Sequence, residues 1–149
     1  MNDAGESLDR FLKAQASVYS EVVRELRASR KTSHWMWLIF PQLKGLGRTS
    51  TAQFYGIESR AEALAYWQHP VLGARLKECA ELVLAVPGGA TAHGVLGTPD
   101  DLKLRSCMTL FAAVAPEASV FREVLERFYA GEADEATVKL LKLKQRRGP

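Results

Sequence analysis

No aspartate or glutamate occurs between positions 26 and 57 of this 149-residue chain. Cysteine is also scarce: Cys79 and Cys107 are the two in the sequence. Both lie in apolar helical patterns and lack CxxC spacing, which indicates reduced core thiols and excludes a disulfide framework. The three histidines form no i, i+4 pair with a carboxylate inside it, so we expect no metal site and no cofactor.

Long apolar runs are absent as well. The longest, residues 35–40, is far too short to span a bilayer, and the polar first seven residues do not read as a signal peptide. We therefore expect a cytoplasmic protein without a membrane partner. Hydrophobic residues make up 47% of the chain, enough for a self-sufficient core, so we expect a single domain over 1–149 with a frayed basic tail at about 145–149.

Apolar residues recur at helical spacing along most of the chain, and no alternating pattern suggests a sheet. The sequence predicts an all-α, irregular single-domain bundle of about six or seven helices. The clearest helix spans 8–29. In another, Thr98 is expected to cap a mostly buried helix over 99 to about 114, with Asp100 and Asp101 in its first turn. Further helices are expected at 49–55, 60–67, from Pro70 to Pro87, 90–96, from Pro116 to Gly131, and 135–144. The apolar run at 34–39 fits either a helical turn or a short buried strand.

The acid-free window combines positive charge with large flat rings. This combination suits an anion that also has a stackable face. We predict stacking on Trp35 and Tyr55, anion contact through Arg48 and Lys44, and backbone approach at Gly45 and Gly47. The full set of candidate ligand-binding residues is His34, Trp35, Gln42, Lys44, Arg48, Tyr55, Lys103 and Gln15.

Each of these candidates also has a structural interpretation. The indoles can fill the core while the cations stay solvated, and Gln15, on an apolar helical stripe, can be satisfied by a nearby loop. Lys103 can pair with Asp100, reach a ligand, or extend its ammonium group into water. His34 can act as a general acid or base or as a donor to a ligand, or it can have only a structural or surface role.

Several segments carry a family resemblance. They are Ser33 to Gln42 (SHWMWLIFPQ), Gly45 to Arg48, Gln53 to Ile57, His69 to Gly73, and Pro99 to Leu104 running into Met108 to Phe111. With Phe11, Ala14 and Gln15, these segments resemble the domain of unknown function 1810 family, a bacterial family of mostly helical proteins. The resemblance covers nearly the whole chain. It implies an all-α fold and no particular reaction.

No P-loop, Rossmann glycine pattern, HExxH or G-x-S-x-G motif is present, so the sequence leaves open whether the protein is an enzyme. Our leading hypothesis is a pocket for a phosphorylated or nucleotide-like anionic small molecule, with an ADP-ribose-type compound as the first substrate class to test. The alternative is a non-enzymatic protein-interaction module. Nucleic-acid binding through the acid-free stretch 136–149 has weaker support, because the net charge is only +3. The oligomeric state is left open.

Overall fold

The computed structural model describes the backbone of residues 3–147 and the side chains of residues 7–144. Within that part of the chain there are ten helices and no strand, so the all-α prediction is confirmed. Seven helices have at least seven residues, which accounts for the expected number; the other three are single short turns of helix. The helices are α1 (Asp3–Ala16), α2 (Tyr19–Arg27), α3 (Met36–Ile39), α4 (Ser50–Tyr55), α5 (Arg60–Gln68), α6 (Leu72–Leu84), α7 (Ala92–Leu96), α8 (Asp100–Val114), α9 (Val120–Tyr129) and α10 (Glu135–Arg147).

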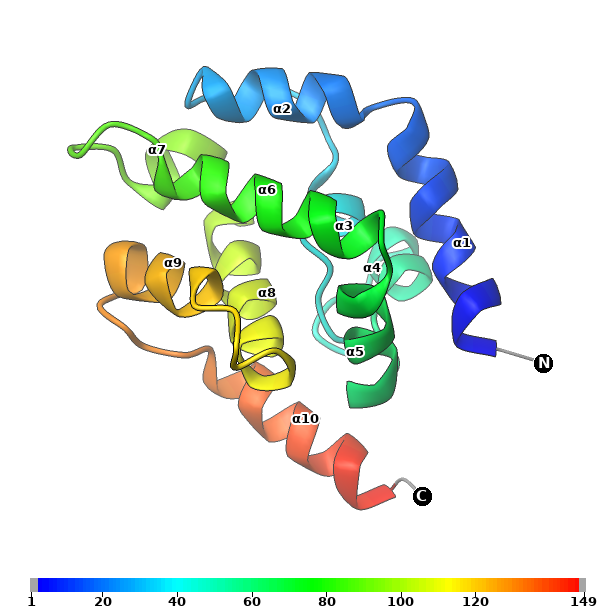
Figure 1. Ribbon diagram of the computed structural model, residues 1–149. Helices are drawn as coiled ribbons and strands as arrows, with labels where there is room; N and C mark the ends of the chain where they lie inside the picture. Colours follow the sequence, from blue (N-terminus) through cyan, green and yellow to red (C-terminus); the bar gives the residue numbers. More distant parts are fainter. Residues whose placement is uncertain (1–2, 148–149) are drawn as a thin grey trace.

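Helix α8 lies at the centre of the bundle, as its apolar residues on most sides predict. It packs against α5, α7, α9 and α10, while α2 lies on the far side of α6, at the top of the view in Figure 1. Eight of its fifteen residues are buried. A helix with so little polar surface has to be covered by others, and this fixes the arrangement of the remaining helices around it.

The single helix predicted over 8–29 is wrong: the chain turns between Ala16 and Tyr19 and forms two helices, α1 and α2. No glycine or proline marks the break, and the apolar periodicity continues through it, so the sequence gives no sign of two helices. The break has a packing cause. Helix α1 packs on α3 and α5, whereas α2 packs on α6 through a face that includes Val22 and Leu26, and one straight helix does not reach both surfaces.

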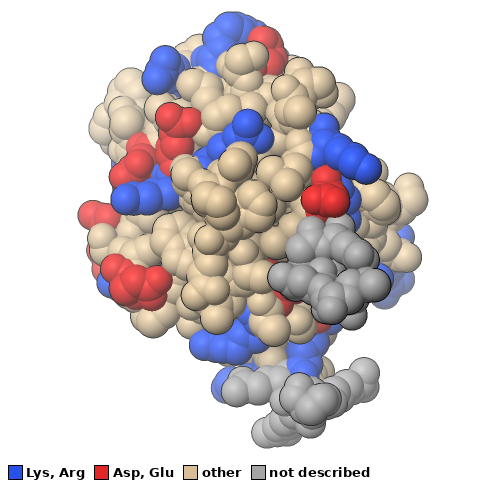
Figure 2. All heavy atoms as spheres, turned by 45° about the vertical axis from the view of Figure 1, so that its right-hand side comes forward, with Lys and Arg blue, Asp and Glu red and all other residues tan. Residues whose placement is uncertain are grey.

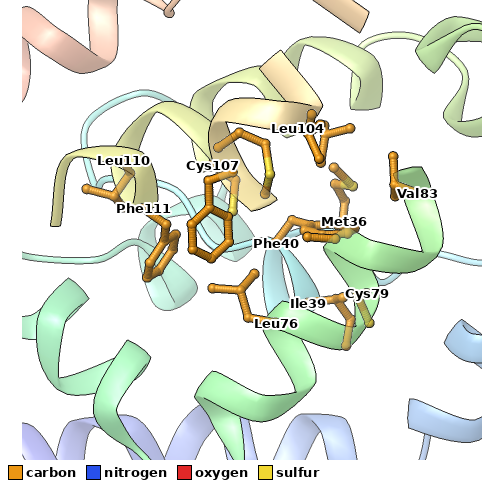
Figure 3. Packing of buried hydrophobic residues seen from close by; sticks show 14 of the residues in the cluster. Met36, Ile39, Phe40, Leu76, Cys79, Val83, Leu104, Cys107, Leu110 and Phe111 are labelled. Atoms are coloured by element: carbon orange, nitrogen blue, oxygen red, sulfur yellow. The ribbon is translucent and has the colours of Figure 1, made fainter. Parts of the chain in front are cut away.

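The core is assembled around the short helix α3. Met36, Ile39 and the following Phe40 are buried between α6 and α8, where they face residues such as Leu76 and Phe111 (Figure 3). The apolar run at 34–39 is therefore a helical turn, not a strand. Both cysteines are buried and free. Burial raises the pKa of the Cys79 thiol to about 12 and that of Cys107 well above its usual value, which keeps both protonated.

Helix ends agree only partly with the sequence. Ser59 accepts a hydrogen bond from the Glu62 backbone N–H, and Asp134 accepts one from the N–H of Thr137, so each of these side chains caps the helix that follows it. The expected Thr98 cap is wrong, because Pro99 takes the N-cap position and no side chain caps α8. At the other end of the chain, α10 continues to Arg147, past the predicted end; the rest of the expected tail, 148–149, lies outside the described residues. Among the described helices, none combines the length and apolar character needed to cross a membrane.

Candidate functional site

The segment between α2 and α3 is held by one buried carboxylate, Glu25, at 1% exposure. Its Oε1 accepts hydrogen bonds from the backbone N–H of Thr32 (2.7 Å), the N–H of Ser33 (3.0 Å) and the indole Nε1–H of Trp35 (3.0 Å). Its Oε2 accepts a fourth from the Ser33 hydroxyl at 2.5 Å. Glu25 is the residue immediately before the acid-free window, and it orders the first part of that window.

Those hydrogen bonds also set the ionisation of Glu25. Burial acts to raise the pKa of the carboxyl, but the bonds from Ser33, Thr32 and Trp35 outweigh it and lower the pKa from 4.5 to about 2. Because the folded-state pKa is the lower one, the ionised group stabilises the fold above the usual pKa, and that stabilisation is lost as pH falls toward 2. It amounts to about 3 kcal/mol at neutral pH.

We therefore expect the free energy of unfolding to fall as pH is lowered from about 5 to 2, and to fall less steeply in Glu25→Gln. Urea unfolding of both proteins at several pH values in this range measures the difference. Parallel pH dependences in the two proteins would show that another group controls the acid response.

A parallel backbone bridge between Leu43 and Ile57 fixes the second part of the window. The Ile57 N–H donates to the Gln42 carbonyl and the Lys44 N–H donates to the Ile57 carbonyl, each at 2.8 Å. The segment that contains α4 is closed into a loop by these bonds. These bonds fix the backbone of Gln42, and its side chain is buried.

Two lysines share one aspartate where this window meets α8. The Lys31 ammonium lies 2.8 Å from Asp100 Oδ2, and the Lys103 ammonium lies 3.3 Å from Asp100 Oδ1. The Lys31 side chain is only 6% exposed, also donates to the Ser33 carbonyl at 2.6 Å, and lies over the Trp35 ring. Lys103 is more exposed, with its ammonium 5.9 Å from the centre of the Trp37 ring. One carboxylate facing two ammonium groups leaves a net positive charge, and Lys103 is the more accessible of the two.

Two adjoining hollows meet at Trp37 and Lys103. The smaller has a volume of about 120 Å³ and is also lined by Lys31, His34, Trp35 and Asp100. The larger, of about 340 Å³, is lined on one side by Gln42, Leu46 and Gly47 and on the other by residues of α8 and the start of α10, including Arg105, Ser106 and Asp134. Together they form a partly apolar depression with lysine at its centre.

Gly47 packs directly on the Trp37 indole. A Cβ atom at this position would lie 3.0 Å from Trp37 Cζ2 and 2.7 Å from the Ala52 side chain. The absence of a side chain thus lets the loop close over the ring. Gly45 has a φ of +109°, which favours glycine, and an added Cβ there would lie 3.3 Å from Leu140. The predicted backbone approach of an anion at Gly45 and Gly47 stays a prediction.

Four of the eight predicted site residues lie around these hollows: His34, Trp35, Gln42 and Lys103. His34 is exposed, whereas Trp35 is 2% exposed and belongs to the core. Missing from the predicted set are Lys31, Trp37 and Asp100. The signal that could have found Lys31 and Trp37 is their place in the same acid-free window as the residues that were chosen.

The other four predicted residues lie elsewhere. Lys44 pairs with Glu58 at 2.8 Å on the surface, and Arg48 is exposed outside both hollows. Tyr55 is half-buried, and its ring packs against Phe11 and Phe54. Gln15 is buried and satisfied: Nε2 donates to the Leu38 carbonyl and to Tyr66, and Oε1 accepts from Arg75. These partners belong to α3, α5 and α6, so the side chain is satisfied within the protein but not by a loop.

A further hollow of about 680 Å³ lies between α6 and the start of α9, but its charged lining is three glutamates (Glu81, Glu117 and Glu123) and one lysine (Lys77), a balance that does not suit an anion. On the face drawn in Figure 2, uncharged side chains occupy the middle and charged groups of both signs lie around it. No group of three or more histidine, cysteine, aspartate or glutamate side chains able to hold a metal occurs among the described residues.

Comparison with known proteins identifies the family. The model of the family described as "Protein of unknown function (DUF1810)" matches residues 5–141. The chain belongs to this family. Among solved structures, it is similar to the conserved hypothetical protein Rv1873 from Mycobacterium tuberculosis, with 52% identity, a TM-score of 0.89, and coverage of 91% of this chain and 96% of that one. Among curated proteins, none matches the chain. The DUF1810 relationship thus agrees with the resemblance carried by the sequence motifs and with the all-α fold.

Proposed function

We propose that the protein binds a small phosphorylated or nucleotide-like molecule in the two hollows that meet at Trp37 and Lys103. The observation that carries this proposal is the position of the Lys103 ammonium, which lines both hollows and lies over an indole ring. A cation beside a ring edge or face suits a ligand that joins an anionic group to a flat ring.

The charges favour an anion at this point. Lys103 and Lys31 are balanced by Asp100 alone within the smaller hollow, and the longer of the two ion pairs involves Lys103. A phosphate oxygen near the Lys103 ammonium group takes up the unbalanced charge without displacing the shorter Lys31 pair. His34 at the exposed side of the smaller hollow is the available proton donor or acceptor if the ligand is a substrate.

The shape favours a ligand with two unlike parts. The larger hollow has apolar walls at Leu46, Pro99 and Leu102, which suit a ring, and the smaller hollow holds the lysines. An ADP-ribose-type compound, with phosphates joined to sugar and ring, remains the first candidate to test.

The test is thermal-shift and calorimetric titration with ADP-ribose, AMP, ribose 5-phosphate and inorganic phosphate. We expect Lys103→Gln to weaken binding of the phosphorylated compounds roughly tenfold to a hundredfold, because a charge-assisted contact is lost. Asp100→Asn, which removes the competing carboxylate, is expected to tighten the same binding while lowering the melting temperature of the free protein.

Lys139→Gln, on the exposed face of α10, is the matched charge control and is expected to leave affinity unchanged. A well-folded wild-type protein that responds to none of these compounds would contradict the proposal, as would an equal loss of affinity in the Lys139 and Lys103 variants.

A second candidate, a protein-interaction module, has one observation in its favour. The Phe54 side chain on α4 is 59% exposed, which is unusual for a large aromatic residue. If the protein is an interaction module, the functional surface is the exposed side of α4 and not the hollows. Phe54→Ser therefore separates the two candidates, since ligand binding around Lys103 does not depend on that ring.

A further inference from the structure

Gln42, which lines the larger hollow, carries a buried polar atom that has no hydrogen-bond partner in the described part of the chain. The side chain is 3% exposed, and its amide Nε2 is buried without a hydrogen bond. Arg10 Nε is also buried and unpartnered, but the other guanidinium nitrogens of Arg10 bond to Glu62 and to the Gly56 carbonyl. Gln42 has no such compensation from its side chain, and a buried donor without an acceptor destabilises a protein.

The backbone at this position does not explain the unused donor. The Gln42 carbonyl accepts from Ile57 and the adjacent Leu43–Ile57 bridge is formed, so the main chain is satisfied whatever side chain stands here. An apolar side chain of the same length fits that backbone without the cost of a buried amide. The glutamine is therefore better explained by what it can bond to in the hollow than by packing.

The neighbouring polar groups of the hollow are already in use. The Ser106 hydroxyl lies within hydrogen-bond distance of the Leu102 carbonyl and of Asp134 Oδ2, and the same Asp134 oxygen caps α10 through Thr137. Arg105 is bonded to the carbonyls of residues 132 and 133. The Gln42 amide thus remains as a buried neutral donor for a ligand.

We propose that Gln42 is a specificity-determining residue that donates a hydrogen bond from Nε2 to a carbonyl oxygen on the ring of the ligand. This inference rests on the proposed function and names its ligand class: a phosphorylated compound whose planar ring carries a carbonyl group, not an amino group, at the edge facing Gln42. The ring lies in the larger hollow against Trp37, and the phosphate lies toward Lys103.

The test compares inosine 5′-monophosphate with adenosine 5′-monophosphate. The inosine compound has a carbonyl group on one ring carbon and a hydrogen on the adjacent ring nitrogen, whereas the adenosine compound has an amino group on that carbon and no hydrogen on that nitrogen. Wild-type protein is expected to bind the inosine compound roughly tenfold more tightly, because the amino group offers Nε2 a donor in place of an acceptor. Gln42→Met keeps the length of the side chain and removes both polar atoms. We expect this variant to lose the preference and to have an unchanged or higher melting temperature.

Gln42→Glu is the second variant, and it replaces the donor with an acceptor. It is expected to reverse the preference toward the adenosine compound. Inorganic phosphate is the matched control ligand: it has no ring, so its affinity is expected to be the same in wild type and Gln42→Met.

The outcomes separate the two proposals. Binding of both nucleotides and phosphate without any preference between the rings overturns the role of Gln42 and leaves the proposed function standing. A preference that persists in Gln42→Met, or a clear fall in the melting temperature of that variant, shows that Gln42 is structural and also overturns the inference. Absence of any response of the wild-type protein to the nucleotides and to phosphate overturns the proposed function, and this inference with it.

Discussion

Replacing Glu25 with alanine is expected to lower the free energy of unfolding by about 3–5 kcal/mol. The carboxylate accepts four hydrogen bonds, from Thr32, Ser33 and Trp35, and all four donors lose their acceptor in the variant. The indole N–H of Trp35 is then left in the core, at 2% exposure, without a partner. Urea unfolding followed by tryptophan fluorescence measures the change.

Two variants control this experiment. Glu21→Ala removes a carboxylate from the same helix that pairs with Arg24 on the surface, and its unfolding midpoint is expected to match wild type. Glu25→Gln keeps one acceptor oxygen and is expected to fall between wild type and alanine. If Glu25→Ala unfolds at the wild-type midpoint, the hydrogen bonds of the carboxylate do not order residues 31–35. The account of how Glu25 positions the candidate site is then wrong.

Gly73→Ala is expected to destabilise the protein by about 3 kcal/mol, or lower its melting temperature by roughly 10 °C, although alanine is the better helix former. Gly73 lies in the first turn of α6, and a Cβ there would meet the Trp67 carbonyl oxygen at 1.9 Å and its carbon at 2.9 Å. These are backbone atoms of α5, so relief requires moving one helix relative to the other. Differential scanning calorimetry gives the shift.

The control for this substitution is Gly88→Ala, in the turn after α6. An added Cβ there meets nothing within 4 Å, so the melting temperature is expected to stay within about 2 °C of wild type. Equal effects at the two glycines would show that loss of backbone freedom, and not the contact with Trp67, determines the result.

The fold could be predicted largely because the apolar periodicity of α6 and α9 reflects burial on the face that each helix presents to the core. The break between α1 and α2 could not, because Ser17 and Val18 carry no local signal and the turn depends on which helices each half contacts. Tertiary packing overrides periodicity in such cases.

The sequence predicts which segment holds the candidate site better than it predicts which residues line it. The acid-free window correctly marks a region where cations are close to rings, since Lys31 lies over Trp35 and Lys103 over Trp37. Its sequence does not reveal that Lys44 pairs with Glu58, just beyond the window, or that Lys31 finds Asp100 on a distant helix. The residues of each pair are far apart in the sequence and come together only when the chain folds.

The contact between Gly47 and Trp37 has a consequence for how this family can vary. Because a Cβ at position 47 would lie 3.0 Å from the Trp37 indole and 2.7 Å from Ala52, the three positions cannot change independently. A relative that carries a side chain at 47 has to reduce the ring at 37 or the methyl at 52, so substitutions at these three positions should covary. The glycine thereby limits the evolutionary paths open to the tryptophan it touches.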